Sequence, residues 1–328
     1  MSAPVRVLFT SAGRRAGLVA CFRQSAEALG HRIEVHACDL SPGLSAACLA
    51  ADHAFQVPRC TDAGYIDALL QYCDAQAIDL LVPTIDTELA VLARSADRFA
   101  AHGTRVHVGS EDYIDVIRDK GETCARLARA GLAVPRTFTL DDLRAPGADL
   151  PWPLFAKPAG GSASRGLAVL EGPGNVERDY PEPMIFQEFL RGPEYTINVF
   201  VDRGGQFRTA VPHLRISVRA GEVEKGRTVR DPRFTRIARQ LVAAIPGASG
   251  ALCFQLIDDP DRGPCVFEIN ARFGGGYPLA HASGAVFARW LLEEITGQPG
   301  SAHDDWAAGV EMIRYDAAIF RDADGNRL

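Results

Sequence analysis

A short segment near residue 270 places polar side chains at alternate positions, a pattern typical of a strand with one functional face. Apolar and polar residues alternate from Phe267 to Phe273, and residues two apart on a strand share a face. Glu268, Asn270 and Arg272 are therefore expected on one side, with the apolar residues packed in the core. Mg²⁺ prefers a few protein oxygens completed by phosphates and water, and this face would suit it. A solvated face on an edge hairpin would show the same alternation.

The segment before this one has the pattern of a facing strand, and the connection between them contains two prolines and a glycine, which suits a loop. If Ile257 pairs with Val266 in an antiparallel hairpin, Gln255 lies directly opposite Glu268. A carboxylate and two amide side chains would then converge on one patch. The run Gly274–Gly276 that follows would allow a ligand to approach the backbone closely, or it would only form a turn.

Two lysines upstream stand in contexts that suit phosphate binding. Lys157 precedes a loop from Gly160 to Gly166 that is rich in glycine and serine. Its backbone N–H groups can lie over phosphates and move as a lid. Lys120 begins an expected helix, and a lysine ammonium serves phosphates as a point charge. Each lysine taken alone is more typical of a solvated surface, and the loop alone would be a flexible hairpin tip.

The first third of the chain alternates strand and helix patterns, which predicts a parallel sheet with helices on both faces. The expected strands are residues 5–10, 33–39, 78–82 and 105–108, and the expected helices are one that ends at Leu29 and two over 65–76 and 88–99. Such sheets bind ligands at the carboxyl ends of their strands. Ser11 and Arg14 could bind an anion there or form a plain turn. Asp86 and Glu88 could contact substrate or only cap a helix.

The rest of the chain predicts a small central region and then an antiparallel sheet. The expected elements are a helical stretch over 110–132, a loop over 141–153, a compact subdomain over 154–186, a hairpin of 195–201 with 207–211, and a helix over 234–245. Basic residues cluster in the antiparallel part at His213, Arg215, Arg219, Lys225 and Arg227. They form either a solvated face or a substrate contact, for which we favour Arg215 over Lys225.

Composition excludes several classes of protein. The chain has 328 residues and a formal charge of -6, without the basic stripe expected of a nucleic-acid-binding protein. Its eight cysteines lie in apolar segments and contain no C-x-x-C pair, so reduced core thiols are expected. Arginines follow the first apolar run instead of preceding it, and no run approaches bilayer length, so we expect a cytoplasmic protein without a membrane partner.

Four motifs in this order resemble the ATP-grasp superfamily, especially the ATP-grasp domains of the carbamoyl-phosphate synthase large chain and the stand-alone carboxylate–amine ligases similar to them. The motifs are Asp119-Lys120 leading to 131–136, the loop 155–166, the segment 186–196, and Glu268-Ile-Asn-Ala-Arg272 followed by Phe-Gly-Gly-Gly. The resemblance covers roughly residues 5 to 300. It implies an ATP-grasp fold, both α/β and α+β, with a Rossmann-like parallel-sheet domain over 1–113, a central lid subdomain over 114–189 and an antiparallel-sheet domain over 190–328.

The resemblance also implies roles for single residues. ATP would be held by Lys120, Lys157, Gly160, Gly161, Ser162, Ser164, Gln187, Glu188, Phe189, Leu190 and Glu194, with the backbone of 187–190 at the adenine and Glu194 at the ribose. One or two Mg²⁺ ions, or Mn²⁺, would be held by Gln255, Glu268 and Asn270. Arg272 and Arg215 would stabilise the transferring phosphoryl group. Lys225 and Gly275 join Ser11, Arg14, Asp86 and Glu88 as substrate candidates.

The implied reaction converts a small-molecule carboxylate and ATP into an acyl phosphate, which an amine then attacks. Relatives in this superfamily commonly form homodimers, which implies a possible homodimer here. Ala271 stands where the family usually has proline, and Asn198 where many relatives have aspartate. A single ATP-grasp unit is visible, so carbamoyl-phosphate synthesis itself is not expected.

Two other functions are weighed against the ligase. Gly13, Gly17 and Asp39 loosely imitate a dinucleotide fingerprint, which would suit an NAD(P)-dependent oxidoreductase. The spacing is not G-x-G-x-x-G, and arginines occupy positions that a pyrophosphate must approach. A non-catalytic ATP-binding module is the other alternative, and the presence of both lysines, the metal set and Arg272 argues against it.

Overall fold

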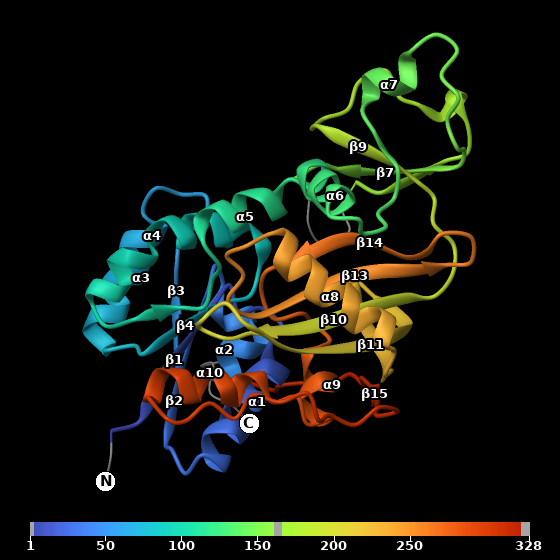
Figure 1. The fold of residues 1–328 in the computed structure, drawn as a ribbon. Helices are drawn as coiled ribbons and strands as arrows, with labels where there is room; N and C mark the ends of the chain where they lie inside the picture. The colour runs from blue at the N-terminus through green and yellow to red at the C-terminus, as the bar shows by residue number, and fades with distance from the viewer. Residues whose placement is uncertain (1–2, 161–165, 323–328) are drawn as a thin grey trace.

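The computed structural model describes residues 3–160 and 166–322, which fold around three sheets (Figure 1). A parallel sheet lies at one end, a small antiparallel sheet at the other, and a six-stranded antiparallel sheet between them. The expected fold class is therefore confirmed: a parallel α/β part is followed by two antiparallel parts.

The parallel sheet has the strand order β3-β2-β1-β4-β5. Its strands are β1 Val5–Thr10, β2 Ile33–Asp39, β3 His53–Gln56, β4 Leu80–Pro83 and β5 Arg105–Val106, and its helices are α1 Ala16–Ala28, α2 Ala46–Ala50, α3 Tyr65–Gln76 and α4 Leu89–Ala101. Val7 and Phe9 of β1 belong to the buried cluster that includes α1, whereas Leu8 belongs to the cluster of α3 and α4. This alternation places helices on both faces of the sheet, as expected. The short strand β3 was not predicted.

Two differences from the expected pattern arise in the central region. The predicted helical stretch over 110–132 is two helices, α5 Glu111–Arg118 and α6 Lys120–Arg129, because Asp119 leaves the helical conformation and its side chain accepts the N–H of Glu122 as a cap. The loop expected over 141–153 contains a short helix, α7 Leu140–Arg144, which Thr139 and Asp142 start with a capping box.

The four-stranded sheet of this region has the order β6-β9-β7-β8 and its own small core. Its strands are β6 Thr137–Phe138, β7 Leu154–Pro158, β8 Ala168–Leu170 and β9 Met184–Glu188. The buried core residues are Leu143, Leu154, Ala156, Leu170 and Phe186. None of them belongs to the clusters that fill the other two sheets.

The six-stranded sheet has the order β14-β13-β10-β11-β12-β15. Its strands are β10 Glu194–Val201, β11 Phe207–Arg219, β12 Glu222–Thr228, β13 Gly250–Asp259, β14 Gly263–Asn270 and β15 Glu311–Ile313, and its helices are α8 Pro232–Ala244, α9 Tyr277–Ala282 and α10 Phe287–Thr296. In Figure 1, α9 and α10 run beneath the sheet toward α1. Phe273, Tyr277 and Trp290 share one buried cluster with Phe9 and Phe22 of the parallel-sheet part. The two large sheets are therefore joined by a common core.

The hairpin of β13 and β14 differs from its prediction in one detail. Gln255 pairs with Glu268, as expected, but Ile257 pairs with Cys265 and not with Val266. A bulge between Gln255 and Leu256 shifts the register there, since an extra residue on one strand displaces every later pair. The strands also continue through most of the expected loop, up to the pair of Asp259 with Gly263.

The remaining sequence-based expectations concern the thiols and the membrane. All eight cysteines are free, and all but Cys60 are buried. Within residues 3–160 and 166–322, no helix combines the length and apolar character needed to cross a bilayer.

Candidate active site

A cavity of about 620 Å³ opens where the three sheets meet. Its walls come from the loops after β1 and β4, from β7 and β9, from strands β10 to β14 of the six-stranded sheet, and from Gly274–Gly276. The parallel sheet contributes the carboxyl ends of its strands, which is where open sheets bind ligands. The three parts of the chain therefore build one pocket together.

The polar face of β14 lines this pocket. Glu268 and Asn270 are on its wall, and Gln255 lies opposite Glu268 on β13. In the orientation that satisfies both ends of its amide, Gln255 donates to Glu268 Oε2 at 3.0 Å and accepts from Arg215 Nη1 at 3.0 Å. Phe267 also lines the pocket, although the alternation had assigned it to the core. Ile269 and Ala271 do lie in the core, as expected.

The oxygen donors on β14 match the ligand preferences of Mg²⁺. Glu268 offers carboxylate oxygens and Asn270 an amide oxygen, which are hard ligands of the kind that Mg²⁺ takes. The amide oxygen of Gln255 faces Arg215 in this arrangement, so Gln255 would have to rotate to become a third ligand. The Asn270 amide oxygen likewise accepts from Arg272 Nη2, at 3.1 Å. Glu268 therefore fits the ion as it stands, and coordination by Asn270 and Gln255 stays a prediction.

Arg272 lies just beyond the end of β14 and is held on several sides. Its Nη2 is 2.5 Å from Asp86 Oδ2 and also donates to Asn270 Oδ1 at 3.1 Å. Burial, the largest single effect, would lower the pKa of Arg272, but Asp86 and the other negative groups around it together outweigh burial, and the pKa is raised. The guanidinium is therefore a fixed positive charge on the face of the pocket that Glu268 and Asn270 form.

The two predicted phosphate lysines both line the pocket. Lys157 is buried, donates to the Phe267 carbonyl at 3.2 Å and lies 5.4 Å from the centre of the Phe267 ring. Burial lowers the pKa of Lys157 to about 8 and also lowers that of Lys120. Binding of phosphates would favour the charged ammonium form of both lysines and raise their pKa values.

The lid loop is described only at its ends. The carbonyl of Gly160 accepts from Arg118 Nη2 at 2.9 Å. Gly161, Ser162 and Ser164 lie outside the described residues. Their predicted phosphate contacts therefore stay predictions.

The strand predicted to hold the adenine ends at the same pocket. Gln187, Glu188, Phe189 and Leu190 all line it. The Gln187 amide donates to Thr137 at 2.9 Å, and the Glu188 carboxylate is held by arginines of neighbouring segments, Arg136 and Arg262. These two side chains are thus satisfied within the protein, whereas Phe189 is 40% exposed.

Glu194, predicted to contact the ribose, lies 3.0 Å from Arg215 Nε. Both residues line the pocket. Burial raises the pKa of the Glu194 carboxyl, and Arg215 opposes the rise. Arg215 therefore contacts both Gln255, which lies beside Glu268, and Glu194, the residue expected at the ribose.

The pocket wall also carries two charged residues that the sequence analysis did not select, Arg15 and Glu222. Arg15 Nη1 lies 3.3 Å from Glu222 Oε1, and Arg314 Nη1 lies 2.9 Å from Glu222 Oε2. Gly275 fits closely against this group, because a Cβ there would lie 2.6 Å from the Glu222 carboxyl carbon. Arg15 directly follows the predicted Arg14, which was a usable signal. Glu222 stands in no motif that would have marked it.

Of the predicted substrate residues, Arg14, Asp86 and Gly275 line the pocket, and Ser11, Glu88 and Lys225 do not. Glu88 is fully buried and accepts from Ser11 at 2.9 Å, from the Thr84 N–H at 2.8 Å and from Tyr65. Burial raises its pKa. These contacts shape the loop that presents Asp86, so Ser11 and Glu88 are positioning residues in this structure and not pocket contacts.

Lys225 is placed elsewhere by the strand itself. It is exposed on β12, where its backbone pairs with Ile313 of the edge strand β15. The predicted basic cluster does not gather at one point. Arg219 pairs with Asp316, Arg227 with Glu311, and His213 is buried beside Asn198 at 3.2 Å. Arg215 is the member of that cluster found on the pocket wall.

Two family models match the chain. A model described as an ATP-grasp domain matches residues 117–276, and one described as a PylC-like N-terminal domain matches residues 7–107. The first match includes Lys120, Lys157, Glu268 and Arg272. Residues 117–276 form an ATP-grasp domain. No match was found among curated proteins.

Solved ATP-grasp structures share the fold. The biotin carboxylase domain of the Hydrogenobacter thermophilus 2-oxoglutarate carboxylase, described as a dimer in complex with MgADP, ADP and bicarbonate, has a TM-score of 0.70 at 13% identity, over 92% of this chain and 72% of its own. L-amino acid ligase from Bacillus licheniformis has a TM-score of 0.67 at 18% identity, over 92% and 76%. N5-carboxyaminoimidazole synthetase from Staphylococcus aureus with ADP has a TM-score of 0.72 at 14% identity, over 93% and 81%.

At these identities the likeness shows the ATP-grasp fold alone. The family matches and these neighbours give no support to an oxidoreductase.

Proposed function

We propose that this ATP-grasp protein is a ligase that uses Mg²⁺-ATP to activate a carboxylate as an acyl phosphate and joins it to an amine. The observation that carries the proposal is the single pocket shared by Lys120, Lys157, Glu268, Asn270 and Arg272. It joins phosphate-binding cations to a magnesium-type oxygen set. Phosphoryl transfer needs little more from a protein than such positioning and charge neutralisation.

The reaction needs no covalent enzyme intermediate. A carboxylate oxygen of the substrate attacks the γ-phosphorus of ATP, and ADP leaves. The amine nitrogen then attacks the acyl carbon, phosphate leaves, and the amine loses a proton. Mg²⁺, when held by Glu268 and Asn270, would neutralise charge on the phosphates. Arg272, fixed by Asp86, is placed to stabilise the charge of the transferring group, and Arg215 assists beside Gln255.

The part of the pocket wall formed by Arg14, Arg15 and Glu222, here called the substrate wall, supports an amino acid as one of the two substrates. The protein would then be an acid–amino-acid ligase. Arg14 and Arg15 line the pocket together with Glu222. Neighbouring positive and negative groups match the carboxylate and ammonium of an amino acid. The resemblance to L-amino acid ligase agrees with this substrate class, although it shows the fold alone.

Further parts of the proposal rest on less specific support. Mn²⁺ would be accepted in place of Mg²⁺, because the ligands are oxygens. We also propose a cytoplasmic protein that forms a homodimer, the state named for the carboxylase neighbour.

The test is a screen for ADP release from Mg²⁺-ATP over amino acids, singly and in pairs, with mass spectrometry to find the condensed product. The ligase proposal predicts ADP release that needs one acid and one amine. Melting temperatures with ATP and with NADH separate the alternatives. Stabilisation by ATP without ADP release in any pair would favour the non-catalytic module. Stabilisation by NADH and not by ATP would reject the ligase.

A further inference from the structure

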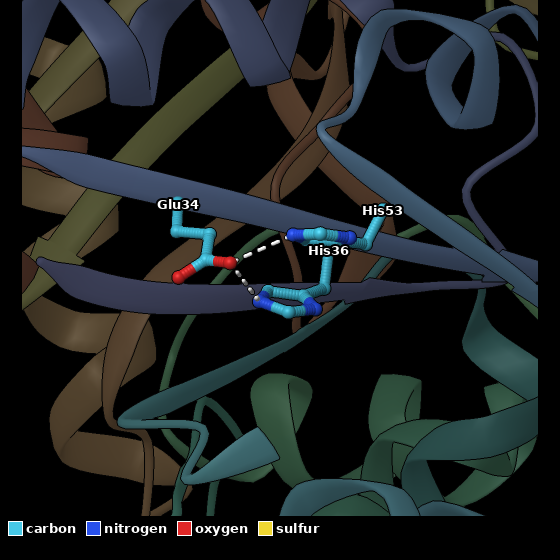
Figure 2. Close-up of side chains that lie close together, drawn as sticks. All are labelled: Glu34, His36 and His53. Carbon is cyan, nitrogen blue, oxygen red and sulfur yellow. Dashed lines mark hydrogen bonds and ion pairs between the residues drawn. The ribbon is translucent and has the colours of Figure 1, made fainter.

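A second cluster of chemically active side chains lies on the parallel sheet, at residues that do not line the pocket. Glu34 and His36 are two apart on β2, and His53 is the registered neighbour of His36 on the parallel strand β3. Residues two apart on a strand and directly registered on the next strand point to the same face. Figure 2 shows the three side chains gathered there, with one nitrogen of each histidine turned toward the Glu34 carboxylate.

The spacing of the potential ligand atoms is close to that of a metal shell. Glu34 Oε1 lies 2.7 Å from His53 Nε2 and 3.9 Å from His36 Nε2, and the three ligand atoms lie within 4.8 Å of one another. Zinc bonds of about 2.0–2.1 Å in a tetrahedral site separate the ligand atoms by about 3.3 Å. The observed distances fall on both sides of that value. Small rotations of the carboxylate and of His53, which is half-exposed, would therefore bring all three atoms to one ion.

His36 supplies an independent sign of a missing partner. Its side chain is fully buried, and its Nε2 has no hydrogen-bond partner. Buried polar atoms are nearly always satisfied, so this atom calls for an explanation. Its other nitrogen, Nδ1, lies 2.9 Å from the Tyr72 hydroxyl. Metal-binding histidines commonly use their second nitrogen in this way, which fixes the ring and leaves the first to the ion.

A hydrogen bond from Arg6 also orients the Glu34 carboxylate toward the histidines. Arg6 Nε donates to Glu34 Oε2 at 3.0 Å, which leaves Oε1 facing the two histidines. Arg6 also opposes a cation by its charge. An ion with real affinity for imidazole is therefore required, which favours Zn²⁺ and its transition-metal neighbours over Mg²⁺ or Ca²⁺.

We propose that Glu34, His36 and His53 form a binding site for a divalent transition-metal ion of the Zn²⁺ class, with water completing the shell. The site is independent of the proposed ligase chemistry. It would fasten β3, an edge strand of four residues that pairs only with β2 in the described sheet, to the rest of the parallel sheet. Metal binding to the native state should then stabilise this end of the molecule.

The test is a titration of chelator-treated protein with Zn²⁺ in competition with a chromophoric chelator, followed by the melting temperature with and without Zn²⁺. His53→Ala is the main variant, because the half-exposed side chain can be removed without opening the core. His102→Ala is its matched control: both histidine side chains are 49% exposed in the same part of the chain, and each contacts one carboxylate.

We expect one Zn²⁺ site in the wild type that raises the melting temperature. In His53→Ala and Glu34→Gln its affinity should fall at least 10-fold, and in His102→Ala it should be unchanged. Co²⁺ should give the visible absorption of a tetrahedral site with nitrogen and oxygen ligands in the wild type and not in His53→Ala. Stabilisation by Mg²⁺-ATP should remain in every variant, which shows that they are folded.

Two results would overturn the proposal. One is equal Zn²⁺ affinity in His53→Ala and the wild type. The other is Zn²⁺ binding that Glu268→Gln abolishes, since that would place the ion in the ATP pocket. Neither result bears on ADP release, so failure here is separate from failure of the ligase proposal.

Discussion

Arg272 and Asp86 form a largely buried ion pair that joins the end of β14 to the loop after β4, with 2.5 Å between Nη2 and Oδ2. The two residues are 186 positions apart in sequence. One belongs to the phosphate end of the pocket, and the other to the loop on the substrate side. A change at the loop that carries Asp86 can therefore reach the group that we propose to stabilise phosphoryl transfer.

Asp86→Asn tests this link. Arg272 would keep its charge but lose its charged partner, and its guanidinium would be free to move away from the phosphoryl position. A misplacement of this kind costs up to about 100-fold in rate. We expect ADP release to fall 10- to 100-fold while Mg²⁺-ATP still raises the melting temperature. Asp67→Asn, which breaks the exposed ion pair with Arg98, is the control and should change neither measurement.

Glu268→Gln tests the metal face. The amide is nearly isosteric but carries no charge, so it holds Mg²⁺ poorly. We expect ADP release to fall by about 100-fold or more, as for loss of one strong transition-state contact. The Mg²⁺-dependent part of the stabilisation by ATP should vanish, with circular dichroism unchanged. Full turnover in this variant would remove β14 from the site.

The buried ammonium of Lys157 predicts proton uptake when ATP binds. Its pKa is about 8 without nucleotide, so the free protein is largely neutral at this position at pH 9 and charged at pH 6.5. Phosphates favour the charged form and raise the pKa. Calorimetry in buffers of different ionisation enthalpy should show uptake near pH 8 to 9 and little at pH 6.5.

Lys157→Arg is the matched variant, because its guanidinium keeps the charge at every pH used. Proton uptake should disappear in this variant while some ATP affinity remains. An uptake equal in both proteins would mean that Lys157 is not at the phosphates.

The lowered pKa of Lys157 also has a consequence for folding. The folded pKa lies below the ordinary 10.5, so this group destabilises the fold below about pH 8. This loss of stability is relieved as pH rises from 8 toward 10.5.

Gly275→Ala separates the two halves of the pocket. An added Cβ would lie 2.6 Å from the Glu222 carboxyl carbon and 2.9 Å from Arg15 Nη1, so the ion pair on the substrate wall must shift. We expect ADP release to fall about 10-fold or more, mainly through a higher KM for the amino acid. Stabilisation by Mg²⁺-ATP should persist. Gly300→Ala is the control, since nothing lies within 4 Å of its Cβ position.

The elements and the phosphate side of the pocket could be predicted because their signals are local. Alternation alone placed Glu268 and Asn270 on one face, and pairing along the hairpin placed Gln255 opposite Glu268. The bulge after Gln255 could not be foreseen, because Val266 and Phe267 are adjacent apolar residues and either one could have faced the core. The helical pattern over 110–132 does not mark the break at Asp119, because a capping aspartate and a helical aspartate look alike in one sequence. The expected helix start at Lys120 is confirmed.

The substrate side was harder to predict because it depends on contacts between distant segments. Glu222 is held by ion pairs with Arg15 and Arg314. Both arginines are far from Glu222 in the sequence, so no local pattern indicates either contact. Glu88 has the residue type of a ligand contact, yet burial and its hydrogen bonds make it a support for the loop. Residue type thus predicted chemistry, whereas only the tertiary fold decides which carboxylate reaches the pocket.

The separate core of the four-stranded sheet has a consequence for the speed of the enzyme. Because that core is not shared, the sheet can swing as one body without exposing the apolar interior of its neighbours. Opening mainly breaks polar contacts, such as Lys157 with the Phe267 carbonyl and Arg118 with the Gly160 carbonyl. The arriving nucleotide can replace the first of these. Release of ADP, which requires the sheet to swing open again, should then limit the rate of turnover. A more viscous solvent should therefore lower the turnover rate more than a change of substrate does.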